Sequence, residues 1–336
     1  MTTGATDRSN LTTTASAIAD LPVSIDDVYA ARERIMAHLH RTPLITSATL
    51  SKLTGTRFSL KAENFQRTGS FKSRGALNAM LQLTPEQLAG GVVTFSAGNH
   101  GQGVAYAAGL LGIQSWVYMA SNAVPAKVDA IRGYGGEAVF GDTIAEALEK
   151  MHAAIEQDGR TYVSPFDNPH VVAGQGVVAL EILEDAPDVE AIVVPIGGGG
   201  LISGMSLVIK SLRPEIKVYG VEPVGAPTVF NSLAAGKPMS LESVSTIADG
   251  LAAPYAGTVT QKIITACVDD VVLVSDDEIK EALDLIITRT KLFAEPAGAA
   301  ATAALLTRRI ELPENTRVVA LLSGGNMSLD RLKTMY

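Results

Sequence analysis

The sequence predicts an α/β protein whose sheets are mainly parallel. Short strand-like runs alternate with helical stretches along most of the 336 residues, and this alternation is typical of parallel sheets with helical crossovers. Several runs are apolar throughout, as expected for strands that are buried on both faces. Since 47% of the residues are hydrophobic and 18% are charged, the chain can bury the core of one large domain or two moderate ones.

The N-terminal region predicts a tail followed by a helix. Residues 1–20 are rich in Thr, Ala and Ser, and no basic start precedes an apolar run there, so we expect a loose tail and no secretion signal. A helix is expected to begin after Ser24, because Val28 and Ile35 return at helical spacing. Ser24 and Asp27 have the spacing of a capping box.

Eight runs have the character of strands. The helical stretch 275–291 carries an apolar face, and Ser275 with Glu278 predicts another capping box at its start. The predicted strands are 57–63, 91–96, 115–120, 137–141, 191–196, 217–222, 270–275 and 317–323.

Charge and cysteine content exclude several classes of function. The net charge is −8 and no basic block occurs, which argues against a nucleic-acid partner. No run of 18 apolar residues is present, so no membrane span is expected. The single cysteine, Cys267, excludes an internal disulfide and a cysteine metal cluster. A cytoplasmic location is the default expectation.

Two loops at predicted strand ends are suited to anions, and ligands of open α/β sheets bind at such ends. "SAGNHGQGVAYAAG" (96–109) offers the polar side chains of Asn99 and His100, and free N–H groups at a helix start suit a carboxylate. A tight turn with glycines for close packing is the alternative. "IGGGGLISG" (196–204) follows an apolar strand, and successive N–H groups there can wrap a phosphate.

The glycine loop fits neither common nucleotide motif. No Gly-Lys-Ser/Thr follows it, and no G-x-G-x-x-G register fits. Glu222, however, ends the next predicted strand, where a ribose-binding acid belongs. A nucleotide-binding oxidoreductase therefore stays open as an alternative, and so does a non-catalytic ligand-binding module.

Two further loops complete the pattern. "LLSGGN" (321–326) places Ser323 at the end of the last predicted strand, and "GSFKSRG" (69–75) places Lys72 beside Phe71 in the first turn of a predicted helix. A reactive amine, a phosphate-binding loop and an anion-binding loop are together what an aldehyde cofactor with a phosphate tail requires. An exposed lysine at a helix start is the ordinary alternative.

Five segments resemble one family in the same order along the chain: "ENFQRTGSFKSRGALNAM", "SAGNHGQGVAYAA", "VPIGGGGLISG", "AEPAGAA" and "LLSGGN". They are similar to the threonine/serine dehydratase group of the fold type II pyridoxal-phosphate enzymes, which also contains serine racemase. The resemblance covers about residues 20 to 336. It implies two open, mainly parallel twisted sheets flanked by helices, as in the tryptophan synthase β subunit. The cofactor would lie in a cleft between a large domain (21–83 and 164–336) and a small domain (84–163).

The resemblance also implies roles for particular residues. Lys72 would bind the pyridoxal aldehyde covalently and later remove the Cα proton of the substrate, with Phe71 near the ring. Asn99 would bond the 3-hydroxyl of the ring, and Ser323 the pyridine nitrogen. The phosphate would be held by the backbone of Gly197, Gly198, Gly199, Gly200 and Leu201, and the substrate carboxylate by Ser96, Gly98, Asn99 and His100.

The implied reaction is β-elimination from a β-hydroxy L-amino acid, L-threonine or L-serine first, to a 2-oxo acid and ammonia. Serine racemase and hydroxyaspartate dehydratase are alternatives on the same scaffold. The racemase pattern has a serine at the position of Ala97, which has no proton to donate, so we expect a dehydratase. The regulatory domain found in biosynthetic relatives is not expected. We expect a homodimer or a homotetramer.

A cation site is the remaining expectation from the resemblance. Racemase-like members bind a divalent ion with an acid at the position of Glu222 and a second acid six residues later, where this chain has Thr228. A strong divalent site is therefore not expected, since hard cations need several oxygen ligands. A monovalent or weakly bound divalent cation at Glu222 is the remaining prediction, and Glu222 as a structural acid bonded to backbone N–H groups is its alternative.

Overall fold

Two sheets form the framework of the protein in a computed structural model, which describes residues 18–335. The larger sheet has six strands in the order β1-β2-β10-β7-β8-β9, and the smaller has four in the order β5-β4-β3-β6. Every pairing is parallel except that of β1 with β2. The predicted fold class, with two open and mainly parallel sheets, is confirmed.

All eight predicted strands form, with ends that differ from the prediction by no more than one residue. The sequence did not reveal β1 and β6, because strands of three and two residues are too short to show an alternating pattern. The strands are β1 (Leu44–Thr46), β2 (Arg57–Ala62), β3 (Val92–Phe95), β4 (Ser115–Ala120), β5 (Glu137–Gly141), β6 (Thr161–Tyr162), β7 (Ala191–Pro195), β8 (Lys217–Pro223), β9 (Asp270–Val274) and β10 (Arg317–Leu322).

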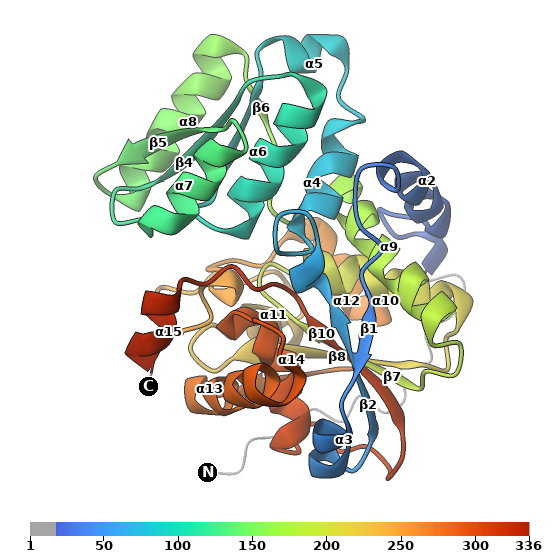
Figure 1. The fold of residues 1–336 in the computed structure, drawn as a ribbon. Helices are drawn as coiled ribbons and strands as arrows, with labels where there is room; N and C mark the ends of the chain where they lie inside the picture. The colour runs from blue at the N-terminus through green and yellow to red at the C-terminus, as the bar shows by residue number, and fades with distance from the viewer. Residues whose placement is uncertain (1–17, 336) are drawn as a thin grey trace.

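Helices cover both sheets, and Figure 1 shows α4 between the part that holds the small sheet and the part that holds the large one. The α-helices are α2 (Ile25–Ile35), α3 (Ala48–Thr54), α4 (Lys72–Met80), α5 (Pro85–Ala89), α6 (Asn99–Leu111), α7 (Pro125–Gly133), α8 (Ile144–Asp158), α9 (Pro169–Asp185), α10 (Gly200–Leu212), α11 (Thr228–Ala235), α12 (Thr258–Cys267), α13 (Asp276–Leu285), α14 (Pro296–Leu306) and α15 (Leu329–Met335). Short turns are η1 (Glu63–Phe65), η2 (Asp249–Leu251) and a π-helical η3 (Ile286–Thr290).

Both predicted capping boxes are present. Ser24 accepts a hydrogen bond from the N–H of Asp27 and Ser275 from that of Glu278, and in each pair the acid bonds back to the cap N–H. Such caps satisfy donors that a helix start leaves free. The predicted helix 275–291 is α13 followed by η3, so the pattern located its start correctly and missed the change of helix type.

The core lies on both faces of the large sheet. In β7, Ile192 and Val194 pack into one cluster, whereas Ala191 and Val193 pack into another on the opposite face. The first cluster draws on α2, α4, α9, α10 and α12, and the second on α3, α13 and α14. Burial on both faces explains why this strand has no polar alternation.

The two sheets are built from different parts of the chain. Strands β3 to β6 fall within 84–163, and the strands of the large sheet fall outside that range. The domain boundaries themselves stay a prediction, and residues 1–17 of the predicted tail lie outside the described residues. Within residues 18–335, no helix combines the length and the apolar character needed to cross a bilayer.

A buried ion cluster holds α4 in place. Arg74 is 1% exposed and donates to both carboxylate oxygens of Glu63, in η1, and of Glu181, in α9, at 2.7 to 3.0 Å. The buried amine of Lys61 lies 2.7 Å from Glu181, so the cluster holds two charges of each sign. Burial alone would lower the pKa of Arg74, but the adjacent carboxylates outweigh it and raise that pKa above its usual value.

We expect Arg74→Met to lower the free energy of unfolding by about 3–5 kcal/mol, because it leaves buried carboxylates without their partner. Urea denaturation measures this change. Arg213→Met is a matched control, since its pair with Glu215 is exposed at the surface and exposed pairs contribute about 1 kcal/mol or less. An equally small decrease in the free energy of unfolding of both variants would contradict the prediction.

Candidate active site

The lysine loop and the Ser323 loop are paired beyond the carboxyl ends of β2 and β10. Lys72 is the first residue of α4. The N–H of Phe71 donates to the carbonyl of Ser323 at 3.2 Å, and Ser70 forms an antiparallel bridge with Gly324. The structure therefore places Ser323 beside the lysine, although 250 residues separate the two loops in the sequence.

Lys72 does not extend into bulk solvent. Its Nζ donates to the carbonyl of Pro165 at 2.7 Å and lies 5.2 Å from the centroid of the Phe71 ring. Burial of the amine lowers the pKa of Lys72 to about 8, because a low-dielectric surrounding disfavours the charged form. A sizeable share of the amine is thus neutral near pH 7 to 8, as a nucleophile or a base requires.

The asparagine loop packs against the lysine helix. Asn99 begins α6 after Gly98, whose N–H donates to the hydroxyl of Ser96 at 3.2 Å. A Cβ on Gly103 would lie 3.2 Å from the carbonyl carbon of Lys72. Glycine therefore permits α6 to approach α4 closely, and the start of α6 lies near the lysine.

His100 is buried and neutral. Its Nε2 lies 3.0 Å from the carbonyl of Val163, and Nδ1 has no hydrogen-bond partner in the described part of the chain. Burial lowers the pKa of His100 to about 3, and the nearby charge of Lys72 contributes. An anion at this loop would therefore meet helix N–H groups rather than an imidazolium.

The tetraglycine loop presents free donors at the start of a 13-residue helix. Within residues 18–335, the N–H groups of Gly197, Gly198 and Gly199 donate to no acceptor, and Leu201 lies in the first turn of α10, which begins at Gly200. Gly199 has φ +88°, and a Cβ on Gly198 would lie 2.1 Å from the ring of Phe166. The loop therefore presents unpaired backbone N–H groups at a helix N-terminus, where phosphates bind in proteins. These residues fit a phosphate group.

One short segment connects the glycine loop to the lysine. Phe166 packs on Gly198, and the preceding Pro165 supplies the carbonyl that Lys72 contacts. Asp167, which follows, accepts hydrogen bonds from the first N–H groups of α12, and Thr260 of that helix donates to the carbonyl of Gly198 at 3.0 Å. The segment 163–168 therefore fixes the distance between the amine and the candidate phosphate site.

Ser323 offers a neutral hydroxyl. The residue is 4% exposed, and its side chain makes no hydrogen bond to any described residue. The Ser323 hydroxyl is thus available for a hydrogen bond to a ligand atom, in which it can either donate or accept.

Glu222 is used within the fold. It is fully buried at the end of β8, and its two oxygens accept the N–H groups of Val229 and Phe230, at 2.8 and 2.7 Å, at the start of α11. Burial raises the pKa of Glu222 to about 8 despite these bonds. The alternative interpretation, a structural acid, describes this geometry, and the carboxylate is not presented to a ribose.

A cation at Glu222 stays a prediction that this geometry does not support. No group of three His, Cys, Asp or Glu side chains able to hold a metal occurs within residues 18–335. Thr228 is also engaged, since its hydroxyl donates to the carbonyl of Ala253 at 2.6 Å.

Three contacts in the site involve groups to which the sequence analysis assigned no role, although Glu295 matches an acid that the resembled family has near the cofactor. Asn326, which closes the "LLSGGN" motif, lies 2.8 Å from Asn99, and Glu295 lies 2.5 Å from the same amide. Burial raises the pKa of Glu295 to about 7. The carbonyl of Pro165 is the third. Only the motifs containing Glu295 and Asn326 offered a signal, because a backbone carbonyl carries none.

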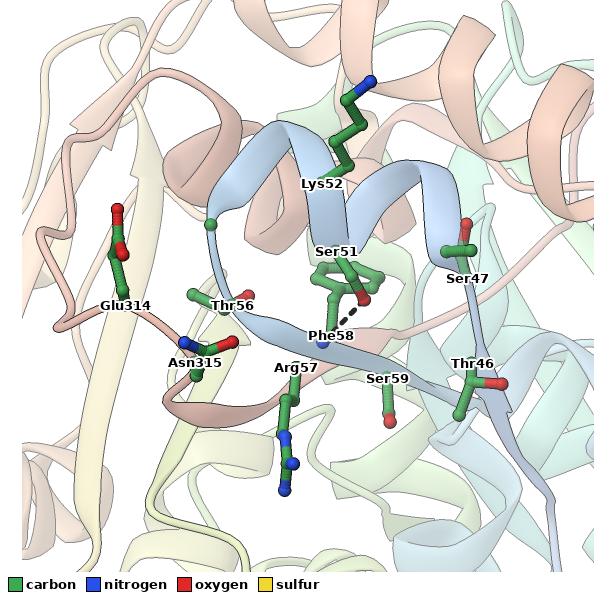
Figure 2. Close-up of a pocket in the computed structure, with 12 residues that line it drawn as sticks. Thr46, Ser47, Ser51, Lys52, Thr56, Arg57, Phe58, Ser59, Glu314 and Asn315 are labelled. Carbon is green, nitrogen blue, oxygen red and sulfur yellow. Dashed lines mark hydrogen bonds between the residues drawn. The ribbon is translucent and has the colours of Figure 1, made fainter.

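A surface cavity of about 680 Å³ lies elsewhere, between α3, the start of β2 and the loop before β10. Figure 2 shows polar side chains such as Ser47, Thr56 and Asn315 around it. Because β2 and β10 are parallel and begin at this edge, the cavity and the lysine loop lie at opposite ends of these strands. None of the predicted site residues lines it.

Comparison with known proteins places this arrangement in context. Residues 35–324 match the family model "Pyridoxal-phosphate dependent enzyme". The chain is 41% identical to the catabolic L-threonine dehydratase TdcB of Escherichia coli, over 93% of this chain and 96% of that protein. It is also 41% identical to serine racemase of Schizosaccharomyces pombe, over 91% and 95%. The structure of maize serine racemase superposes with a TM-score of 0.89 at 38% identity, over 94% and 97% of the two chains.

The lowered pKa of Lys72 predicts a pH-dependent effect on the stability of the cofactor-free protein. Below pH 8 the folded state carries a charge that burial disfavours, whereas the unfolded state keeps its usual pKa near 10.5. Each pKa unit corresponds to about 1.4 kcal/mol, but Lys72 is only half-buried and water screens part of the penalty. We expect Lys72→Met to raise the free energy of unfolding by about 2 kcal/mol at pH 7.

This gain should shrink as pH rises from 8 and vanish near 10.5. Between these two values the folded parent has already released the proton of Lys72, whereas the unfolded parent still binds it. Above 10.5 the amine is neutral in both states, so the burial penalty is gone. Urea denaturation of cofactor-free protein across this range gives the test. Lys237→Met, at an exposed lysine, controls for general effects of removing a charge. A gain for Lys72→Met that does not depend on pH would contradict the assignment.

Proposed function

Because this chain belongs to the family of pyridoxal-phosphate dependent enzymes, we propose that it converts a β-hydroxy L-amino acid, L-threonine or L-serine, to a 2-oxo acid and ammonia. The observation that carries the proposal is the Lys72 amine. It has a lowered pKa, and it lies between a donor-rich glycine loop and the start of α6. The curated relatives at about 41% identity, named above, support the choice of substrate class.

The residues of this chain divide the binding of the cofactor among them. Lys72 would hold the aldehyde and Phe71 would lie near the ring, Asn99 would donate to the 3-oxygen, and Ser323 would meet the pyridine nitrogen. The backbone N–H groups of Gly197, Gly198, Gly199, Gly200 and Leu201 would hold the phosphate. When bound, pyridoxal phosphate supplies a carbonyl that joins to amines and a conjugated ring that withdraws electrons from the substrate Cα.

Lys72 would then act as the base. A neutral Nζ can accept the Cα proton of the substrate, and its carbonyl partner at Pro165 keeps the amine in place. The carboxylate of the substrate would bind at the start of α6 among Ser96, Gly98, Asn99 and His100. Since His100 is neutral, the helix N–H groups and the helix dipole would provide the attraction.

A serine racemase is the second candidate, because serine racemases are among the similar proteins. Racemisation needs a proton donor on the other face of the substrate. Ala97 packs against the small-sheet cluster of Val117, Met119 and Ile131, and its methyl group has no proton to give. This favours elimination. Hydroxyaspartate remains an alternative substrate, and assays on a panel of β-hydroxy amino acids distinguish them.

Oligomeric state, location and cations belong to the same proposal. We expect a homodimer or homotetramer in the cytoplasm, which light scattering on the purified protein and cell fractionation test. A weak effect of monovalent cations on activity would revive the cation prediction, although the oxygens of Glu222 already bind helix N–H groups.

We expect Gly198→Ala to weaken binding of pyridoxal phosphate at least tenfold. Its new methyl group would collide with the ring of Phe166 and displace the donors of the glycine loop. Equilibrium dialysis measures the affinity. Gly133→Ala is the control, because a Cβ there meets no atom within 4 Å. Unchanged affinity in folded Gly198→Ala protein would argue against a phosphate at this loop.

The central test compares the parent protein with Lys72→Ala. The parent should absorb near the imine band of bound pyridoxal phosphate, lose that band to borohydride, and release 2-oxo acid from L-threonine or L-serine. Lys72→Ala should lose at least 10³-fold in turnover, since nucleophile and base are the same amine. Parent-like turnover in the variant would overturn the proposal, and D-serine formed as fast as 2-oxo acid would favour the racemase.

A further inference from the structure

Four polar groups from distant parts of the chain form one connected row at the site. The Nδ2 of Asn326 donates to the carbonyl of Thr68 at 2.7 Å and to the Oδ1 of Asn99 at 2.8 Å. The Nδ2 of Asn99 donates to the Oε1 of Glu295 at 2.5 Å. Asn99 belongs to the segment of the small sheet, whereas the other three lie with the large sheet.

The ends of this row fix its direction. The carbonyl of Thr68 can only accept a hydrogen bond, so the nitrogen of Asn326 must face it. An amide nitrogen has two hydrogens, and Asn326 uses one on Thr68 and the other on Asn99. At the far end, Glu295 is 3% exposed and provides an acceptor oxygen for Asn99.

These two neighbours leave the Asn99 amide a single orientation. If it were flipped, its nitrogen would face the nitrogen of Asn326, and its oxygen would face the carboxyl oxygen of Glu295. The hydrogen bond to Asn326 would be lost, and so would the bond to Glu295 while its carboxyl is ionised, so that groups of like polarity would be opposed in a half-buried site. In the observed orientation Asn99 uses one N–H on Glu295 and keeps the other.

Two glycines make room for the row. A Cβ on Gly69, which has φ +71°, would lie 2.4 Å from the Oδ1 of Asn326, and a Cβ on Gly324 would lie 2.4 Å from the Oε1 of Glu295. Any side chain at either position would push one member out of line. The backbone is thus shaped around these two residues, beside the paired lysine and Ser323 loops.

We propose that Asn326 and Glu295 are positioning residues that hold the Asn99 amide so that it presents one N–H, and not its oxygen, to an acceptor atom of the cofactor. This inference rests on the proposed function, since it concerns the same cofactor. It assigns a role to two residues that do not need to touch the reacting atoms. It also makes the donor available only when the start of α6 lies against Asn326 and Glu295.

The test uses Asn326→Asp, which keeps the shape and replaces both donated hydrogens by an acceptor. The flipped Asn99 amide can then donate to the new carboxylate, and Glu295, whose pKa burial raises to about 7, can donate to the amide oxygen when it is protonated. The flipped orientation should therefore be preferred, and the oxygen of Asn99 would replace its donor. We expect the dissociation constant of pyridoxal phosphate, measured by equilibrium dialysis, to rise at least tenfold. The absorption maximum of the bound cofactor should shift, because a hydrogen bond to the ring system is lost.

A double variant separates orientation from stability. In Asn326→Asp with Glu295→Gln, the new glutamine can donate to the oxygen of the flipped Asn99. The double variant should therefore melt at a higher temperature than Asn326→Asp alone, while its affinity and absorption maximum stay those of the single variant. If the second substitution restored affinity and spectrum as well, the role of the row would be structural only and the proposal would fail.

Asn64→Asp is the matched control. Asn64 donates to the carbonyl of Phe293 at 3.2 Å near the same loops but has no bond to the row. The affinity of this variant for pyridoxal phosphate and the spectrum of its bound cofactor should therefore match those of the parent. An equal loss in this control, or parent-like affinity and spectrum in folded Asn326→Asp protein, would overturn the inference. If Asn326→Asp does not fold, Asn326→Ala takes its place, and its affinity for pyridoxal phosphate should fall about three- to tenfold.

The outcomes also separate this inference from the proposed function. A parent protein that binds no pyridoxal phosphate contradicts the proposed function itself. A parent that binds it, together with an Asn326→Asp variant that binds it equally well, contradicts only the positioning role.

Discussion

The site depends on three helices that begin at one place. Lys72, Asn99 and Gly200 are the first residues of α4, α6 and α10. A helix start leaves N–H groups without partners and carries a partial positive charge. Three such starts around one amine attract anions, and they form a surrounding in which a protonated lysine is poorly solvated. The same constraint would thus favour binding of the phosphate and the carboxylate proposed above, and the burial that it imposes lowers the pKa of Lys72.

The packing that brings these starts together relies on small residues and buried charge. Glycine at 103 lets α6 approach the backbone of Lys72, and glycine at 198 accepts the ring of Phe166. Arg74, one half-turn beyond Lys72, is fixed by two carboxylates from other elements. The buried charges therefore fix α4 at Arg74, and the first residue of the same helix is the proposed reactive amine, Lys72.

The local elements of the fold could be predicted from the sequence better than the contacts between distant loops. Strands buried on both faces, such as β7, and the capped starts of α2 and α13 followed from apolar runs and cap spacing. Three of the loops were found because glycines follow strand-like runs, and the fourth because Lys72 stands beside an aromatic residue in a predicted helix start. Which loops meet could not be derived from spacing, because β10 inserts between β2 and β7 and only this brings Ser323 to Lys72. The sequence left two interpretations of Glu222 open, because an acid at a strand end can serve a neighbouring helix as well as a ligand.

The central place of β10 in the large sheet has a consequence for biosynthesis. The parallel neighbour of β2 is made about 260 residues after β2 itself, and β7 also waits for that neighbour. The large sheet can close only after residues 317–322 have been made, so pairing across it is of long range and slow. A nascent chain stopped before residue 317 lacks the strand that joins its two halves. In such a fragment β2 and β7 have no strand between them, whatever local structure its helices have formed.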